Sequence, residues 1–297
     1  MTNKQKNYIP LHLVFTALLL SSTGALSQTQ VLVSIRPLAL LVQDLVLSGD
    51  SVEQLLPTTA SPHHYALNIS DRQKIAEADL VFWIGPELES FLRKALSNHP
   101  RISTLSRLNT LVWAPALQAD SRQNHHDHSG RDYHLWLNPL NLMALARAIT
   151  DDLIARSPER AAAYENRLAR LLDRLARVDR ELVEQLAAVR DKPFIVLHPA
   201  YDHFIEHYEL TQVDYVVKIP GASLSAKHRY KLQKLEEIVC IFGEEGQRPK
   251  RLEQLSKQLN VRAIILDPLG VNVDDDEGVD TLLRKMGEQF HNCLSPQ

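Results

Sequence analysis

The sequence predicts an α/β protein of two lobes, each with a mainly parallel sheet and flanking helices, joined by one long backbone helix. Short β-branched runs alternate with helical segments in two stretches, residues 31–106 and 193–270. Between these stretches, apolar side chains recur every three or four residues without interruption. The predicted domains are an N-terminal lobe, a linker helix and a C-terminal lobe, over residues 28–156, 157–190 and 191–297.

Residues 1–27 have the features of a secretory signal peptide. Lys4 and Lys6 precede an apolar run from Leu11 to Leu20, and small residues follow as far as Ser27. The run is too short for a comfortable membrane span. With no cysteine near the expected cleavage site, we expect a soluble periplasmic protein without a lipid anchor.

The elements of the first lobe follow in order. A strand is expected from Val31, and the helical pattern after Pro37 stops at Gly49. The alternation then repeats, with segments over 51–57 (strand-like), 70–78 (helix), 79–85 (strand), 87–96 (helix) and 101–106 (strand).

The linker helix begins with Ser157-Pro158-Glu159, a plausible cap with proline in the first turn. At 1.5 Å per residue it would reach roughly 50 Å, enough to run the length of two lobes. A coiled coil is the alternative, but the strands resume at once. The second lobe is predicted to hold strands over 193–200, 212–219, 239–245 and 261–270, with helices over 201–210, 225–238 and 249–259.

The composition is that of an ordinary globular protein, with 44% hydrophobic and 23% charged residues. Loss of the signal peptide would take the formal charge from -3 to -5, because Lys4 and Lys6 leave with it. Such a chain has no basic excess for phosphates, so nucleic acid is not an expected partner.

The two cysteines, Cys240 and Cys293, lie in a chain bound for an oxidising compartment, so we predict a disulfide between them. Closing a loop of that length would contribute roughly 4 kcal/mol in the loop-entropy description. The alternative is a pair of buried free thiols.

The chain contains 13 histidines, and their positions matter more than their number. His63, His134 and His198 lie where strands are expected to end or loops to begin, which is where open α/β sheets collect ligands. Three others, His125, His126 and His128, fall in the polar loop 119–132. That loop either gathers metal or is simply solvated.

Several stretches together resemble one family, the zinc-specific periplasmic solute-binding proteins of ABC importers (ZnuA-like). They are VLVSIRPLALLV, LLPTTASPHHYALNISDRQKIAEADLVFWIGPELESFL, YHLWLNPLNLMALARAI, VLHPAYDHFIEHYEL and LDPLG, in matching order and spacing. The resemblance implies zinc ligands at His63, His134 and His198, with the loop histidines as an auxiliary metal loop. It also implies two lobes joined by a long helix and, in some members, a C-terminal disulfide.

The resemblance implies function and partners as well. The expected protein is a monomer that binds Zn²⁺ with high affinity in the periplasm and delivers it to the membrane permease of an ABC importer. A second periplasmic zinc carrier is a further partner that it allows. No catalytic residue or bound organic cofactor is expected.

The chemistry of zinc fits this ligand set. Zn²⁺ prefers neutral imidazole and takes four ligands, so three histidines leave one position for Asp267 of LDPLG or for water. Asp267 has the alternative role of bracing its loop. Three histidines favour zinc over manganese, which prefers oxygen ligands. His64 is interpreted as a neighbour of the site or a surface residue.

Two other function classes compete. Residues 203–207 spell H-x-x-E-H, the inverted zinc-peptidase motif, which would place His203 and His207 on one helical face. The other alternative is a periplasmic zinc chaperone or adhesin that is not coupled to a transporter.

Overall fold

The structure is a computed structural model that describes residues 28–115, 131–217 and 224–296, apart from 233, 236, 247 and 248. The predicted signal peptide lies outside the described residues, as do His125, His126 and His128. Within the described ranges, no helix combines the length and apolar character needed to cross a bilayer.

The first half of the chain forms a parallel four-stranded sheet in the order β2-β1-β3-β4. Every side chain of β3 is buried, because helices cover both faces of a central parallel strand. The strands are β1 (Gln30–Val33), β2 (Ser51–Gln54), β3 (Leu80–Trp83) and β4 (Ile102–Thr104). The helices of this half are α1 (Arg36–Leu45), α2 (Ile69–Glu77) and α3 (Arg93–Leu96).

The second half repeats the design with a parallel sheet in the order β6-β5-β7-β8. Its strands are β5 (Phe194–Val196), β6 (Gln212–Tyr215), β7 (Cys240–Glu244) and β8 (Arg262–Leu266). Its shorter helices are α6 (Asp202–His207), α7 (Ala226–Leu232) and α8 (Pro249–Leu259). The α/β class with two mainly parallel sheets is therefore confirmed.

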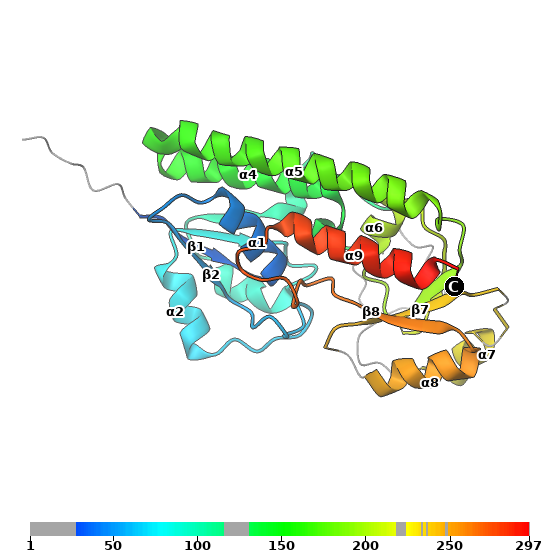
Figure 1. The fold of residues 1–297 in the computed structure, drawn as a ribbon. Coiled ribbons are helices and arrows are strands. Elements are labelled where there is room, and N and C mark those ends of the chain that lie inside the picture. The colour runs from blue at the N-terminus through cyan, green and yellow to red at the C-terminus, as the bar shows by residue number, and fades with distance from the viewer. Residues whose placement is uncertain are drawn as a thin grey trace, which may run out of the picture.

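Three long helices connect the halves: α4 (Pro139–Arg156), α5 (Ala161–Ala187) and α9 (Val279–Leu294). Figure 1 shows α5 running along the molecule above both sheets, beside α4 and α9. Its apolar stripe is buried, and α5 packs against α1, α4 and α9. A Cβ at Gly287 of α9 would lie only 2.1 Å from Leu182 of α5, so glycine permits this close approach. The expected long helix is confirmed, with a 3₁₀ turn at Pro158–Arg160 before it.

Some helices differ from expectation. The helix expected over 87–96 is broken at Glu89, whose backbone is not helical and whose buried carboxylate accepts a hydrogen bond from the Gly85 N–H. Helix α7 ends at Leu232, short of the expected 238. The sequence analysis did not place α4 or α9. Helix α4 starts where the Asn138 side chain accepts a hydrogen bond from the Leu140 N–H, followed by Pro139 in the first turn.

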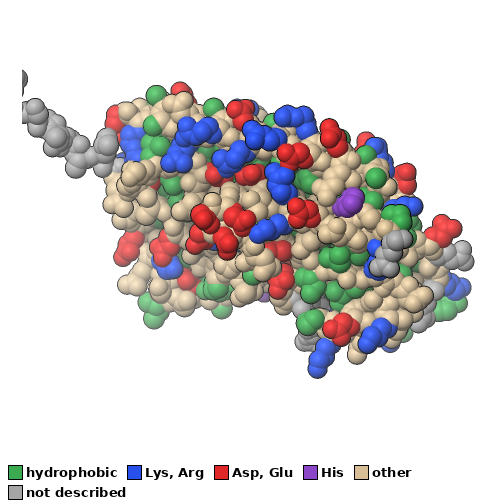
Figure 2. All heavy atoms as spheres, in the orientation of Figure 1, with side chains coloured by type: hydrophobic (Ala, Val, Ile, Leu, Met, Phe, Trp, Pro, Cys, Tyr) green, Lys and Arg blue, Asp and Glu red, His purple; other side chains and the backbone are tan. Residues whose placement is uncertain are grey.

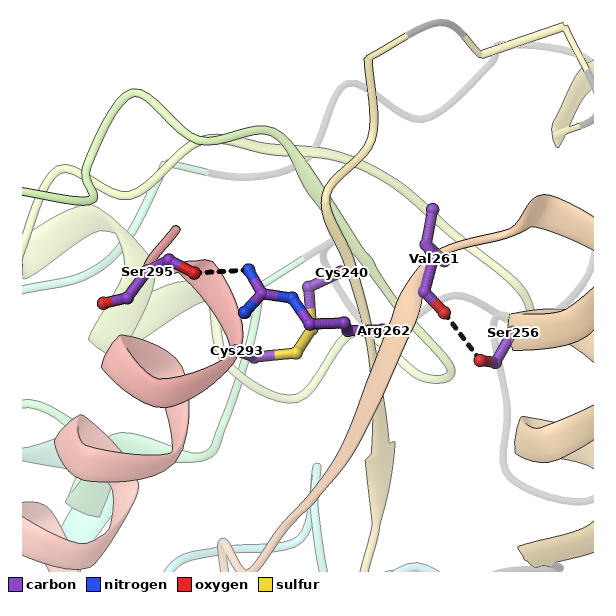
Figure 3. The surroundings of a disulfide bond; sticks show 6 residues. All are labelled: Cys240, Ser256, Val261, Arg262, Cys293 and Ser295. Carbon is purple, nitrogen blue, oxygen red and sulfur yellow. Dashed lines mark hydrogen bonds between the residues drawn. A yellow bond between two sulfur atoms is a disulfide. The ribbon is translucent and has the colours of Figure 1, made fainter. Parts of the chain in front are cut away.

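The predicted disulfide is present, joining Cys240 of β7 to Cys293 of α9 with a Cα–Cα distance of 6.0 Å (Figure 3). Both cysteines are fully buried. Nearby, the Arg262 guanidinium donates to the Ser295 carbonyl at 2.6 Å. The last helix is thus held covalently against the second sheet.

On the face that carries α5 and α9, basic and acidic side chains are interspersed (Figure 2). Part of this pattern is an ion-pair cluster in which Arg174 of α5 contacts Asp44 of α1 and Asp280 of α9. The cluster ties the two halves together at the surface of α5, the spine helix.

Candidate metal centre

Three imidazole rings meet between the two sheets, each from a different segment. His63 lies in the turn region after β2, His134 directly precedes the 3₁₀ helix Leu135–Leu137, and His198 follows β5 by two residues. The ring centroids are 5.4 Å apart for His63 and His134, 5.6 Å for His63 and His198, and 6.0 Å for His134 and His198. The histidines singled out from the sequence are therefore brought together.

The spacing is slightly wider than coordination needs. Three imidazoles on a tetrahedral zinc, with Zn–N near 2.0–2.1 Å, place their ring centroids about 5 Å apart. Accordingly, among the described residues no group of three or more His, Cys, Asp or Glu side chains already has the arrangement of a metal site. Small ring movements, of the order of an ångström or less, would close this gap.

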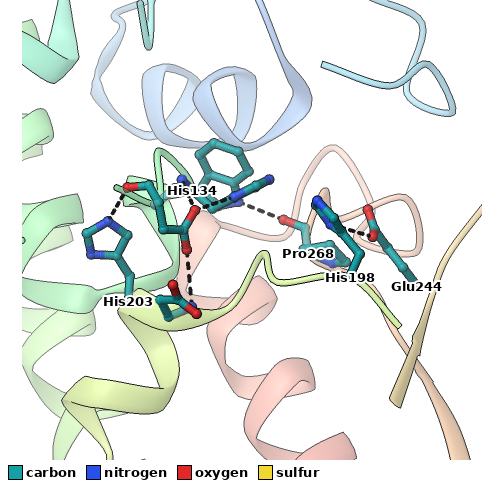
Figure 4. Close-up of polar contacts among 8 residues, drawn as sticks. His134, His198, His203, Glu244 and Pro268 are labelled. Carbon is teal, nitrogen blue, oxygen red and sulfur yellow. Dashed lines mark hydrogen bonds and ion pairs between the residues drawn. The ribbon is translucent and has the colours of Figure 1, made fainter. Parts of the chain in front are cut away.

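Asp132 fixes the orientation of His134. Its Oδ1 lies 2.5 Å from Nδ1 of His134 and also accepts a hydrogen bond from the His134 backbone N–H (Figure 4). Its Oδ2 accepts from the Asp202 N–H at 3.1 Å. A carboxylate on Nδ1 holds the proton there, which leaves the Nε2 lone pair of His134 for a metal.

His198 has a similar carboxylate neighbour. Nδ1 of His198 lies 3.4 Å from Oε2 of Glu244, the last residue of β7 (Figure 4). This contact is an ion-pair approach without a hydrogen bond, since Nδ1 of His198 is buried and has no hydrogen-bond partner among the described residues. Nε2 of His63 is buried and makes no hydrogen bond within the described part of the chain. An unpaired buried imidazole nitrogen is costly unless a ligand satisfies it.

The electrostatics of the three rings differ. Burial, reinforced by the neighbouring His134 and His198, lowers the pKa of His63 to about 3. Burial also lowers the pKa of His134, but the Asp132 carboxylate outweighs it, so the pKa of His134 lies above its usual value. His63 is therefore neutral and ready to ligate at physiological pH, whereas a proton competes for His134.

Asp267 lies just past β8 and is buried, with 6% of its surface exposed. Its two carboxylate oxygens accept hydrogen bonds from the backbone N–H groups of Val271 and Asn272, at 2.9 and 2.7 Å. The next residue, Pro268, accepts a hydrogen bond from the Trp136 indole at 2.7 Å (Figure 4). Asp267 therefore braces its loop; each oxygen keeps a second lone pair for another partner.

His203 and His207 of the H-x-x-E-H segment contact different groups. Nε2 of His203 bonds to the Asp132 carbonyl at 2.9 Å, and Nε2 of His207 bonds to Asp179 of α5 at 2.7 Å. His203 thus holds in place the residue that orients His134, while His207 ties α6 to the spine helix. These contacts give both histidines structural roles in place of a shared peptidase metal.

Asp132 and Glu244 are site residues that were not predicted from the sequence. Asp132 stands two positions before His134, and this short spacing was the available signal; for Glu244 the signal was a carboxylate at the end of a predicted strand. His134 itself does not follow a strand, contrary to the interpretation of its position, because the residues after it form a 3₁₀ turn that leads into α4.

Comparison with known proteins gives consistent results. The family model described as "Zinc-uptake complex component A periplasmic" matches residues 31–293. The chain is 32% identical to a high-affinity zinc uptake system protein ZnuA of Yersinia pestis, over 99% of this chain and 100% of that one. It is 30% identical to the protein of the same name from Haemophilus ducreyi, over 94% and 98% of the two chains.

Solved structures share the fold. A crystal structure of ZnuA has a TM-score of 0.76 at 23% identity and covers 91% of this chain and 100% of its own. A zinc-bound ZnuA with residues 138–173 deleted has a TM-score of 0.74 at 24% identity, covering 91% and 100%.

Proposed function

The chain belongs to the family of periplasmic component A proteins of zinc-uptake complexes, and from that premise we propose that it captures Zn²⁺ for an ABC-type importer. It acts as a solute-binding protein and not as an enzyme. Zinc is its cargo, held by His63, His134 and His198 and passed to a membrane permease. Residues 1–27 direct the chain to the periplasm as a cleaved signal peptide, without lipid attachment.

The observation that carries this proposal is the convergence of three imidazole rings, with centroids 5.4, 5.6 and 6.0 Å apart. His63 offers an unpaired buried Nε2, and carboxylates stand behind Nδ1 of the other two rings. In such a site zinc exchanges bound water for three imidazole ligands, which it prefers, and each carboxylate partly offsets the positive charge of the ion. The ion is held between the two sheets, so the relative position of the halves sets how readily it leaves.

Single substitutions test the ligand set. His63→Ala, His134→Ala and His198→Ala should each weaken zinc binding by orders of magnitude in a competition titration with a chromophoric chelator. His207→Ala is the matched control, because that histidine contacts only the spine helix and its own neighbours among the described residues. Retention of wild-type affinity by any of the three variants would remove that residue from the site.

The fourth position is filled by Asp267 or by water, and one pair of variants separates these cases. If Asp267 is a ligand, Asp267→Ala should weaken zinc binding about as much as the loss of one of the histidines does. As a loop brace, its loss would change thermal stability and leave zinc affinity within a few-fold of wild type. Glu277→Ala, which removes another acceptor of loop N–H groups, is the control for loop damage.

Delivery is a separate test. Cells that lack their own zinc-binding component but retain the permease and ATPase should regain growth in zinc-depleted medium when this chain is supplied. His134→Ala should fail to restore growth. Tight zinc binding without any rescue would favour a periplasmic chaperone instead.

A further inference from the structure

A hollow of about 460 Å³ opens beside His63. It is lined by His63, His64, Tyr65, Ala66, Ser90 and Phe91. One zinc-ligand candidate therefore has a face on open solvent, and a second imidazole shares that space. Nothing in the three-histidine site itself requires the second imidazole.

The walls of the hollow are held in place. The Tyr65 hydroxyl donates to Asp71 of α2 at 3.1 Å, and the Tyr65 and Phe91 rings meet edge to face at 5.7 Å. The turn that carries the histidine pair is braced by Ser61, whose hydroxyl accepts from the His63 N–H and whose carbonyl accepts from the His64 N–H. Both imidazoles therefore project from a fixed turn.

The two rings are placed to share an ion briefly. The centroids of His63 and His64 are 6.5 Å apart with the ring planes tilted by 55°, slightly beyond the roughly 5 Å that two zinc-bound imidazoles adopt. His64 is exposed, so its side chain can rotate, whereas His63 is largely enclosed. A modest swing of His64 alone would bring both rings onto one ion.

We propose that His64 is a capture ligand: it binds incoming Zn²⁺ together with His63 in this hollow, then releases it as His134 and His198 take over. This inference rests on the proposed zinc-binding function and concerns the route by which the ion arrives. Because Nε2 of His63 is buried, an ion in the hollow is not yet bound by that nitrogen, and the hand-over exchanges the His64 imidazole for Nε2 of His63 and the two other rings.

This role has a kinetic signature. A ligand that binds only during passage lowers the barrier in both directions, so its loss slows association and dissociation by the same factor. A permanent ligand behaves differently, because its loss raises the dissociation rate. The ratio of the two rates, which gives the equilibrium constant, separates these cases.

The test measures both rates by stopped flow with Zn²⁺ as the probe. Trp136 supplies the signal, because its ring lies 5.2 Å from that of His134. We expect His64→Gln to slow zinc association several-fold, and to slow chelator-induced dissociation by the same factor. His64→Asp should keep most of the association rate, since a carboxylate is also a zinc ligand. His291→Ala removes an imidazole from α9 and should change neither rate.

The possible outcomes are distinct. Equal rates in wild type, His64→Gln and His291→Ala overturn the capture role while the zinc-binding function stands. A His64→Gln variant that releases zinc faster also overturns it, because His64 would then be a resident ligand. If the wild-type protein shows no saturable zinc binding, it is the proposed function that fails.

Discussion

At the scale of single residues, the candidate centre depends on which nitrogen of each imidazole is free. Asp132 binds Nδ1 of His134, which leaves Nε2 of that ring for a metal, and Glu244 lies 3.4 Å from Nδ1 of His198. His63 presents Nε2 without a carboxylate behind it. Burial lowers the pKa of His63 and the Asp132 carboxylate raises that of His134, so these two rings differ in proton affinity.

This difference predicts the pH dependence of zinc affinity. At the proposed site, zinc and a proton compete for Nε2 of His134, and the raised pKa of that residue means that zinc affinity should fall as pH drops through a value above 6.5. The pKa of His63, about 3, adds no competition between pH 5 and 8. Asp132→Asn should weaken binding at pH 8 by about 10–100-fold and move the pH-dependent fall to lower pH.

Isothermal competition titrations from pH 5 to 8 measure both effects. Asp179→Asn is a matched control, because Asp179 contacts His207 and Tyr208 away from the zinc ligands. An Asp132→Asn variant with reduced affinity but an unchanged pH profile would show that Asp132 supports the loop without tuning His134.

Glu89 gives a second prediction at this scale, about stability. It is fully buried, and burial raises its pKa to about 7 against hydrogen bonds that favour the charged form. The folded protein therefore binds a proton that the unfolded chain releases near pH 4.5. This contribution to stability is complete below pH 4.5 and is lost as pH rises through about 7.

Glu89→Gln, which resembles the protonated acid, should remove that dependence. Relative to the variant, the wild-type free energy of unfolding should fall by about 3 kcal/mol between pH 4.5 and 8. Urea denaturation at several pH values measures the difference. Parallel curves for the two proteins would mean that Glu89 stays ionised in the fold.

The candidate ligands were accessible from the sequence only through the combination of position and family resemblance. The apolar run before His198 predicts a strand and thus places that residue at a sheet edge, but His134 is preceded by the polar loop 119–132, which predicts no strand. Asp132 and Glu244 could not be predicted, because the contact of a carboxylate with Nδ1 of a ligand histidine depends on three-dimensional packing. No local pattern encodes a partner on another strand.

At the scale of elements, the alternation of strands and helices was predicted because parallel strands buried on both faces read as continuous apolar runs. The break in the helix at Glu89 was not predicted, because a single buried carboxylate interrupts a sequence that otherwise has a helical pattern. Helix α9 was missed because it begins at Gly278 without a side-chain cap. Its position depends on α5 and on the disulfide.

The disulfide gives the prediction at this scale. Replacing both Cys240 and Cys293 with Ala should lower the free energy of unfolding by about 4 kcal/mol, because the 53-residue loop is no longer closed in the unfolded chain. Urea denaturation measures this loss. Reducing agent should destabilise the wild type similarly and leave the double variant unchanged; an effect of reductant on the variant would assign the loss to something other than the bond.

At the scale of the whole molecule, α5 packs against helices from both halves, so we expect the halves to unfold together. Leu175 is fully buried in the middle of this helix. Leu175→Ala should cost about 3 kcal/mol, within the range for large core truncations. Val183→Ala, at a position 51% exposed on the same helix, should cost little.

Two spectroscopic signals report on cooperativity. All three tryptophans, Trp83, Trp113 and Trp136, lie in the first half, whereas far-UV circular dichroism reports on the whole chain. The two transitions should coincide in wild type and shift together in Leu175→Ala. Separate transitions would show that the spine helix does not couple the halves.

The matching strand orders, β2-β1-β3-β4 and β6-β5-β7-β8, bear on how the protein evolved. Such a correspondence is what the duplication and fusion of one ancestral four-stranded unit would leave behind, with α4 and α5 inserted between the copies. On that view the ancestor was a single-sheet protein that formed a homodimer, and the metal centre arose at the interface between the two copies. On the same view, the order of the strands is the trace of that duplication in the present fold.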